Sequence, residues 1–125
     1  TIQKCIVDNN DITKRTSSDS EDYGGAAIYN WYDSTLFIKN STISNNLKNY
    51  KNGDYVVGAV TSLGKTIISQ NSYFVNNNAT NIFRVSGYNS VFINNNVIMN
   101  NNISNALLEN GLNVNTIDNN IFINN

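Results

Sequence analysis

One short pattern recurs along this chain and constrains its fold more than any other feature. It runs from Leu36 to Asn46 as LFIKNSTISNN, with apolar residues at fixed places and a closing Asn-Asn pair. It returns at Ile67–Asn77, Val91–Asn101 and Asn115–Asn125, and a shortened form opens the chain at Thr1–Asn10. Such a pattern at a near-constant interval is typical of a solenoid, in which each repeat stacks on the next.

The spacing of the Asn-Asn pairs gives the length of one turn. The last two intervals, which close at Asn101 and Asn125, are equal, whereas the intervals that close at Asn46 and Asn77 are longer. The basic turn is therefore about 24 residues long, which lies within the range of known solenoid repeats. A solenoid accommodates extra residues as loops on one face, so we expect loops in the two longer turns.

Aligning the copies places apolar residues in two columns. One column holds Val7, Ile43, Phe74, Ile98 and Phe122, and the other holds Ile2, Ile38, Ser69, Ile93 and Ile117. Alternate residues of a strand face the same side, so these columns are expected to line the interior.

The phase of the pattern breaks between the two columns, where the copies carry Lys4, Asn40, Asn71, Asn95 and Asn119. We expect a corner there, because asparagine tolerates the left-handed backbone conformation. Its amide can also hydrogen-bond along a column of identical neighbours, which predicts a ladder at this corner. The Asn-Asn pairs predict a second corner by the same argument.

A less regular strand is expected in the rest of each turn. The aligned segments are Ala26–Asn30, Gly58–Ser62, Ile82–Ser86 and Ala106–Asn110. If Ile28, Val60 and Leu108 face inward, this alignment places Arg84 inside as well. If the alternate residues face inward, Glu109 is inside. The sequence leaves the two phases open.

Together these features predict an all-β fold, a right-handed single-stranded parallel β-helix of four to five coils of about 24 residues with two loop insertions. Parallel crossover connections are right-handed in about 98% of cases. Residues 1–125 are expected to form one β-helix module, a fragment of a longer surface protein, because neither end shows the polar cap that solenoids need. Asparagine-rich disorder is disfavoured, since the apolar columns keep their register.

The two insertions are predicted at about residues 11–23 and 47–55. Both begin directly after an Asn-Asn pair in successive turns, so we expect them to project side by side from one corner. Aromatic residues gather in and beside them, and the candidate ligand contacts are Tyr23, Tyr29, Trp31, Tyr32, Tyr50 and Tyr55. Aromatic rings with polar tips suit recognition surfaces, although exposed tyrosine is also common on β-sheets.

The first insertion also carries an acidic cluster of Asp19, Glu21 and Asp22. Carboxylate oxygens are ligands for calcium, but a solvated loop without any cofactor is the interpretation we favour. N-glycosylation sequons begin at Asn40, Asn78 and Asn102. Of these, Asn78 and Asn102 are expected to be more exposed than Asn40.

The composition argues against several classes of function. A net charge of -1 gives no basic footprint for nucleic acid. The chain has no histidine, which removes the commonest general base and metal ligand. No apolar run reaches the roughly 18 residues that span a membrane. The single Cys5 cannot form an intrachain disulfide and is expected to be a small buried side chain. No convergent catalytic groups are found, so an enzyme is not predicted.

The stretch GGAAIYN (Gly24–Asn30), followed by STLFIKNSTISNN (Ser34–Asn46), resembles a known repeat. It is similar to the units of adhesin-like proteins of methanogenic archaea and, more loosely, to polymorphic outer-membrane protein repeats of bacteria. NSYFVNN, NNVIMNN and NNIFINN match the second half of the unit, while Asn81–Phe83 and Asn105–Leu107 depart from its GGA. The resemblance implies a pectate-lyase-like right-handed β-helix in a large, secreted, surface-displayed protein. It carries over no catalytic residues.

These observations lead us to expect an extracellular adhesin-like module, a rigid rod that displays loops on the cell surface. Its partners would be other cell surfaces or glycans. A self-assembling filament or surface-layer component, whose partners are neighbouring copies of itself, is an alternative because exposed strand edges template pairing. A polysaccharide-active β-helix enzyme is a further alternative, which the absence of paired catalytic groups disfavours.

Overall fold

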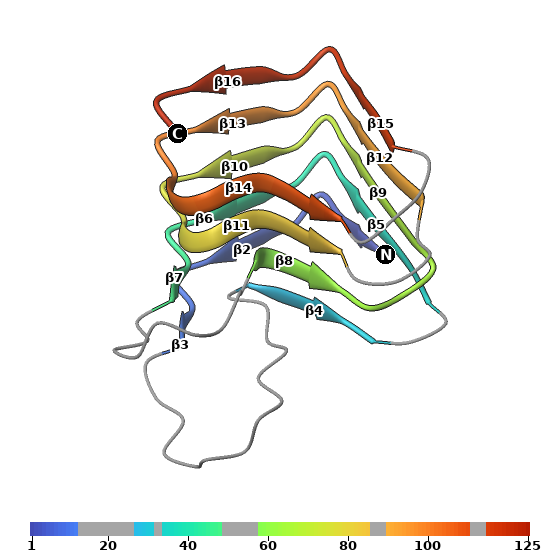
Figure 1. Cartoon of the computed structure of the whole chain (residues 1–125), viewed down its shortest axis with the longest axis horizontal. Helices are drawn as coiled ribbons and strands as arrows, with labels where there is room; N and C mark the ends of the chain where they lie inside the picture. The colour runs from blue at the N-terminus through green and yellow to red at the C-terminus, as the bar shows by residue number, and fades with distance from the viewer. Residues whose placement is uncertain (13–26, 32–33, 49–57, 86–89, 111–114) are drawn as a thin grey trace.

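A computed structural model of the chain describes residues 1–12, 27–31, 34–48, 58–85, 90–110 and 115–125. These residues form β-strands and no helix, which confirms the predicted all-β class. The strands belong to three sheets, and every pairing between neighbouring strands is parallel. The chain passes through the three sheets in turn, and successive passes lie one above the other (Figure 1).

The sheets are named here in the order in which the chain reaches them. Sheet A contains β1 (Ile2–Gln3), β5 (Thr35–Lys39), β9 (Thr66–Gln70), β12 (Ser90–Asn94) and β15 (Asn115–Asp118). Sheet B contains β2 (Ile6–Asp8), β6 (Thr42–Ser44), β10 (Tyr73–Val75), β13 (Val97–Met99) and β16 (Ile121–Ile123). Sheet C contains β3 (Asp11–Ile12), β4 (Ile28–Asn30), β7 (Leu47–Lys48), β8 (Gly58–Ser62), β11 (Asn78–Val85) and β14 (Asn102–Asn110).

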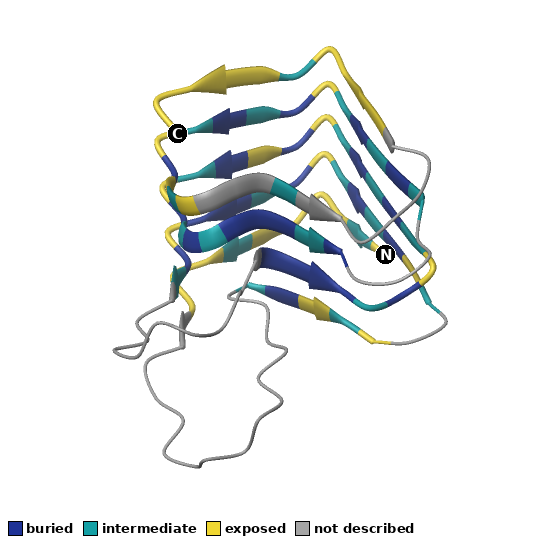
Figure 2. Ribbon diagram, in the orientation of Figure 1, coloured by how far each residue is buried: buried dark blue, intermediate teal, exposed yellow. Residues whose placement is uncertain are grey.

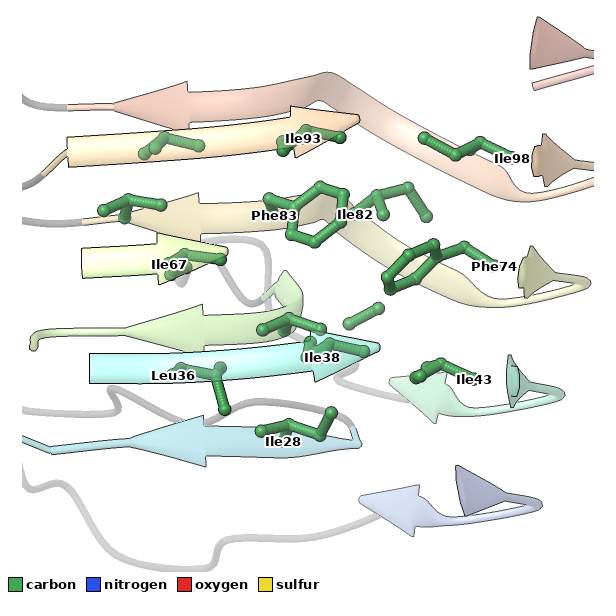
Figure 3. Packing of buried hydrophobic residues seen from close by; sticks show 14 of the residues in the cluster. Ile28, Leu36, Ile38, Ile43, Ile67, Phe74, Ile82, Phe83, Ile93 and Ile98 are labelled. Atoms are coloured by element: carbon green, nitrogen blue, oxygen red, sulfur yellow. The ribbon is translucent and has the colours of Figure 1, made fainter. Parts of the chain in front are cut away.

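Both predicted apolar columns are present in register. In sheet B, Phe74 pairs with Ile43 on one side and Ile98 on the other, and all three side chains are fully buried. Figure 3 shows them one above another in the core. The Phe74 ring also meets that of Phe83 from sheet C edge-on, with centroids 4.7 Å apart. Burying side chains of this size stabilises the fold by about 1.5–3 kcal/mol each.

Burial falls at the outermost strands of these sheets (Figure 2). Ile117 and Phe122 continue the two columns, yet they are 45% and 49% exposed because β15 and β16 are edge strands. Cys5 was expected to be buried and is exposed. It lies between β1 and β2, which form the opposite edges of sheets A and B, so no neighbouring strand covers it on that side.

Left-handed backbone marks both predicted corners. Positive φ angles of 48–54° occur between sheets A and B at Lys4, Asn40, Asn71, Asn95 and Asn119. Angles of 49–55° occur between sheets B and C at Asn9, Asn45, Asn76 and Asn100, and at the equivalent Asn124 that follows β16. This conformation costs most residues about 1–2 kcal/mol, and asparagine is one of the few that visits it routinely. The prediction of asparagine corners is therefore confirmed.

The amide ladder, in contrast, lies one residue later than predicted. The left-handed residues are exposed, and in the inner turns the residue that follows each of them is buried. At the second corner these following residues are Asn10, Asn46, Asn77, Asn101 and Asn125. The equivalent places at the first corner hold Cys5, Ser41, Ser72, Asn96 and Asn120. The left-handed residue makes the bend, which frees the next side chain to point inward.

The hydrogen bonds of Asn77 illustrate the ladder. Its Oδ1 accepts from the backbone N–H of Asn46 (3.1 Å) and from Asn46 Nδ2 (2.9 Å). Its own Nδ2 donates to Asn101 Oδ1 (3.0 Å) and to the carbonyl of Ile43 (2.9 Å). Asn46 and Asn101 repeat this arrangement with their own neighbours. The ladder thus satisfies buried amides, which would otherwise be costly.

Sheet C corrects the predicted alignment. Val60 pairs with Ile28 and Phe83, and Phe83 pairs with Leu108. Arg84 therefore lies beside Thr61 and Glu109, and the predicted alignment of Arg84 with Val60 and Leu108 is wrong by one residue. A register shift between β11 and β14 adds to the irregularity. Asn78 and Asn81 of β11 pair with Asn102 and Ala106 of β14, which carries one extra residue between them.

The structure also shortens the predicted insertions. Asp11–Ile12 and Leu47–Lys48 are strands β3 and β7, which pair with each other in parallel. The insertions therefore leave within sheet C, after these short strands, and not at the corner itself. Residues 13–26 and 49–57 lie outside the described part of the chain.

Candidate binding surface

Only two of the predicted contact residues, Tyr29 and Trp31, lie in the part of the chain that the structure describes. The other candidate contacts, Tyr23, Tyr32, Tyr50 and Tyr55, and the acidic cluster of Asp19, Glu21 and Asp22 lie outside the described residues. The candidate surface is therefore built here from Tyr29, Trp31 and the strands that border the two insertions.

Tyr29 and Trp31 form an exposed aromatic pair at an edge of sheet C. Tyr29 belongs to β4, the edge strand of that sheet, and Trp31 follows the strand directly. Their ring centroids are 5.5 Å apart with the planes tilted by 46°, and the side chains are 38% and 56% exposed. Two adjoining rings of this kind offer an apolar surface with polar tips, which suits recognition of a polar ligand with apolar faces.

A polar network holds the backbone beneath Trp31. Asn30 donates from Nδ2 to Ser62 Oγ (2.9 Å), and Ser34 Oγ lies 2.8 Å from Asn30 Oδ1 and beside the Trp31 carbonyl. Gly64 packs against this network, because an added Cβ would come within 2.3 Å of the Ser34 carbonyl oxygen. These contacts fix the backbone on both sides of Trp31 and leave its ring exposed.

The strands that precede the two insertions pair with each other, and so do the strands that follow them. β3 pairs with β7 where the chain leaves sheet C, and β4 pairs with β8 where it returns. In β11 the same interval is spanned by Ala79 and Thr80 alone, since Asn78 pairs with Leu47 and Asn81 with Gly58. The two insertions therefore leave sheet C, and return to it, between neighbouring strands (Figure 1), while the loops that were predicted to project side by side lie outside the described residues.

The three sequons differ in exposure. Asn40 and Asn102 are exposed, whereas Asn78 is partly buried, so the expected order is wrong for Asn78. Asn40 is exposed because its left-handed corner turns the side chain outward. Asn78 is less exposed because it pairs with strands on both sides, Leu47 of β7 and Asn102 of β14.

The charged groups of the described residues are few. Among them, no group of three or more His, Cys, Asp or Glu side chains is placed to hold a metal ion. Asp8 of β2 accepts hydrogen bonds at Oδ1 from the Ser44 hydroxyl and from Asn45 Nδ2 (2.8 Å). These two hydrogen bonds, with that of Ser44 the stronger influence, hold the pKa of Asp8 below its ordinary value of 3.8.

A second exposed surface was missed from the sequence. The outer face of sheet B carries Tyr73, Val75, Val97, Met99, Ile121 and Ile123. The signal was available, because YFV, VIM and IFI have apolar residues on both faces of a strand where a solvated sheet alternates apolar and polar residues.

Comparison of the chain with protein families, curated proteins and solved structures found no match. In the part of the chain that the structure describes, no helix has the length and apolar character needed to cross a membrane.

Proposed function

We propose that the successive passes of the chain through the three sheets are the coils of a right-handed, single-stranded parallel β-helix. On this proposal the chain is an extracellular, adhesin-like module of a cell-surface protein. The observation that carries the proposal is the placement of both insertions, which leave from paired strands β3 and β7 and return to paired strands β4 and β8. A regular stack of strands that carries its insertions at one position is suited to displaying loops.

The stack has the properties of a rigid spacer. Its buried columns and amide ladder hold successive strands in register, at the spacing of about 4.8 Å expected for hydrogen-bonded strands. Length therefore grows with the number of coils, while the insertions remain on one side. The exposed rings of Tyr29 and Trp31 would contribute to contacts with glycans or other cell surfaces, since aromatic faces pack on sugar rings.

Deletion of the insertions tests this function. We would replace residues 13–26 and 49–57 with short Gly-Ser linkers and measure binding of the purified chain to glycan arrays and to whole cells. The proposal expects the parent chain to bind and the deletion variant to lose most of that binding while its circular dichroism spectrum is retained. Trp31→Ala is the milder companion, with a partial loss expected. Equal binding by parent and deletion variant would refute the role of the insertions.

An end-to-end filament is the second candidate, and one observation favours it. Ile117 and Phe122 belong to inward columns but are 45% and 49% exposed on edge strands, so they would pack against a further coil. Negative-stain electron microscopy of the isolated chain is the test. Filaments that persist after the insertions are deleted would favour assembly over display, and single short particles at high concentration would exclude it.

A further inference from the structure

The outer face of sheet B is apolar over three consecutive strands. Tyr73, Val97 and Ile121 form one outward column in register. Val75, Met99 and Ile123 form the second, two positions further along β10, β13 and β16. Tyr73, Ile121 and Ile123 are 51%, 55% and 42% exposed, and the other three are partly exposed. We name these six residues the outer apolar patch.

Sheet A provides the contrast. Its outer face has one apolar column, Phe37, Ile68 and Phe92, between a hydroxyl column and a polar column. The hydroxyl column is Thr35, Thr66 and Ser90, and the polar column is Lys39, Gln70, Asn94 and Asp118. A solvated sheet face usually looks like this one. Sheet B departs from it by presenting two adjoining apolar columns, and contiguous apolar surface of this kind marks an interaction site.

The outer apolar patch has an uncharged rim. Strands β6, β10, β13 and β16 and the corners on both sides of them contain no charged residue, and all these residues are described. Each edge of the patch is instead lined by exposed asparagines, with Asn71, Asn95 and Asn119 on one side and Asn76, Asn100 and Asn124 on the other. Along sheet B the nearest charged residue is Asp8 of β2, beyond β6, and at the corner with sheet A the Asp118 carboxylate of β15 accepts a hydrogen bond from the rim residue Asn119 (3.2 Å).

We propose that the outer apolar patch binds the same patch of a second copy of this chain, side by side in a two-fold symmetric dimer. A two-fold interface brings identical surfaces together, so a charged residue on it would face either its own copy or another residue of the same surface. This face has none between β6 and β16. Depletion of charge with enrichment of Tyr and Met is also the composition of interface cores.

The asparagine rim makes the face complementary to itself. Two-fold axes that lie between the facing sheets bring one asparagine row against either its own copy or the opposite row. An amide both donates and accepts hydrogen bonds, so each arrangement can be satisfied, whereas rows of lysine or aspartate would repel their copies. This inference depends on the parallel sheets alone and is independent of the proposed adhesin function.

The size of the patch sets the expected affinity. Six apolar residues with six rim asparagines make up about half of the 20–30 residues that each partner contributes to a standard interface. We therefore expect a weak dimer, with a dissociation constant on the order of 0.1 mM.

Sedimentation velocity of the 125-residue chain from about 10 μM to 1 mM tests the inference. A reductant is included because exposed Cys5 would otherwise link copies. The parent chain is expected to shift from monomer to dimer, and Val97→Lys in the patch is expected to weaken dimerisation at least tenfold. The matched control is Ile68→Lys, a partly exposed β-branched residue on the outer face of sheet A, which should leave dimerisation unchanged.

Each outcome supports or overturns the dimer. A parent chain that stays monomeric at the highest concentration overturns it, and so does equal loss of dimer in both lysine variants. Species larger than a dimer that survive Val97→Lys indicate end-to-end stacking and overturn the side-by-side arrangement. If Val97→Lys fails to fold by circular dichroism, the near-isosteric Val97→Thr takes its place, with a threefold to tenfold weaker dimer expected.

Discussion

The segment that contains the two asparagine corners and the segment that forms sheet C differ in how much their number of residues varies from turn to turn. From the inward column of sheet A to the ladder of the second corner, every turn uses the same number of residues, as from Ile38 to Asn46 and from Ile93 to Asn101. In sheet C, two turns carry insertions, and of the two continuous strands, β11 and β14, the second holds an extra residue. Variation is therefore confined to sheet C and to the connections that lead from sheet C to sheet A.

The buried ladder explains the difference. A residue added before Asn77 would move its amide away from Asn46 and Asn101 and leave buried donors without acceptors. The interval spanned by Ala79 and Thr80 in β11 lies outside this ladder, and a register shift is already present there. Strict spacing thus follows from buried polar groups that must align, which apolar contacts alone do not require.

Moving an insertion should break this contrast most clearly. A Gly-Ser-Gly-Ser segment placed between Asn95 and Asn96 should abolish cooperative folding of the turns around it, because several ladder hydrogen bonds cannot re-form. The same segment between Ala79 and Thr80 should cost about 1 kcal/mol, in line with loop closure. Urea denaturation followed by circular dichroism measures both. Similar losses at the two places would show that sheet C is not the permissive wall.

A single ladder deletion should have the next largest effect. Asn77→Ala removes an amide that donates two hydrogen bonds and accepts two, all buried. The expected loss is about 3 kcal/mol of unfolding free energy, because Asn46 and the Ile43 carbonyl are left unsatisfied. Chemical denaturation measures the loss. A loss below about 1 kcal/mol would mean that water replaces the amide and that the ladder does not fix the spacing.

The neighbouring position separates backbone from side chain. Asn76 is exposed with φ at 55°, and its side chain makes a long hydrogen bond to Asn45 (3.3 Å). Asn76→Ala should cost about 1 kcal/mol through the left-handed conformation, whereas Asn76→Gly should be near neutral. The thermal unfolding temperatures of the two variants, compared with the parent chain, measure this difference. Equal destabilisation by alanine and glycine would assign the effect to the amide.

The smallest expected effect concerns Asp8, which precedes the second corner in the first pass of the chain. Its pKa is lowered in the folded chain by Ser44 and Asn45, so its contribution to stability is present above its unfolded pKa and is lost as pH falls through the folded value. Asp8→Asn should therefore slightly reduce the loss of stability between pH 6 and pH 3. Urea midpoints at the two pH values measure this, and an unchanged difference would argue against those hydrogen bonds in solution.

The corners and columns could be predicted because they repeat at one interval. Ile43, Phe74 and Ile98 are separated by spacings that include an insertion, yet the Asn-Asn pairs keep them in phase. The ladder was placed one residue early because the sequence does not show that a left-handed corner residue turns its side chain outward and the residue after it inward, and at the second corner it does not tell which asparagine of the pair is left-handed. Both Asn76 and Asn77 suit either role by residue type.

Sheet C could not be predicted to the residue for a related reason. The interval from Phe83 to Leu108 is one residue longer than the interval from Phe74 to Ile98, so counting by the turn misaligned Arg84. Tyr29 and Trp31, two of the predicted contact residues, are exposed, and their role in binding stays a prediction. The outer apolar patch could not be defined from the sequence alone, because it needs the register of β10, β13 and β16, which places its residues on one face.

The amide ladder runs in one direction only. In each ladder asparagine, Oδ1 accepts a hydrogen bond from the turn before it and one Nδ2–H donates to the turn after it, as in Asn46, Asn77 and Asn101 in succession. Synthesis proceeds in the same direction. Each turn that emerges during synthesis therefore brings an Oδ1 acceptor to N–H donors that the preceding turn already holds in place. The last folded turn thus acts as the template for the next one.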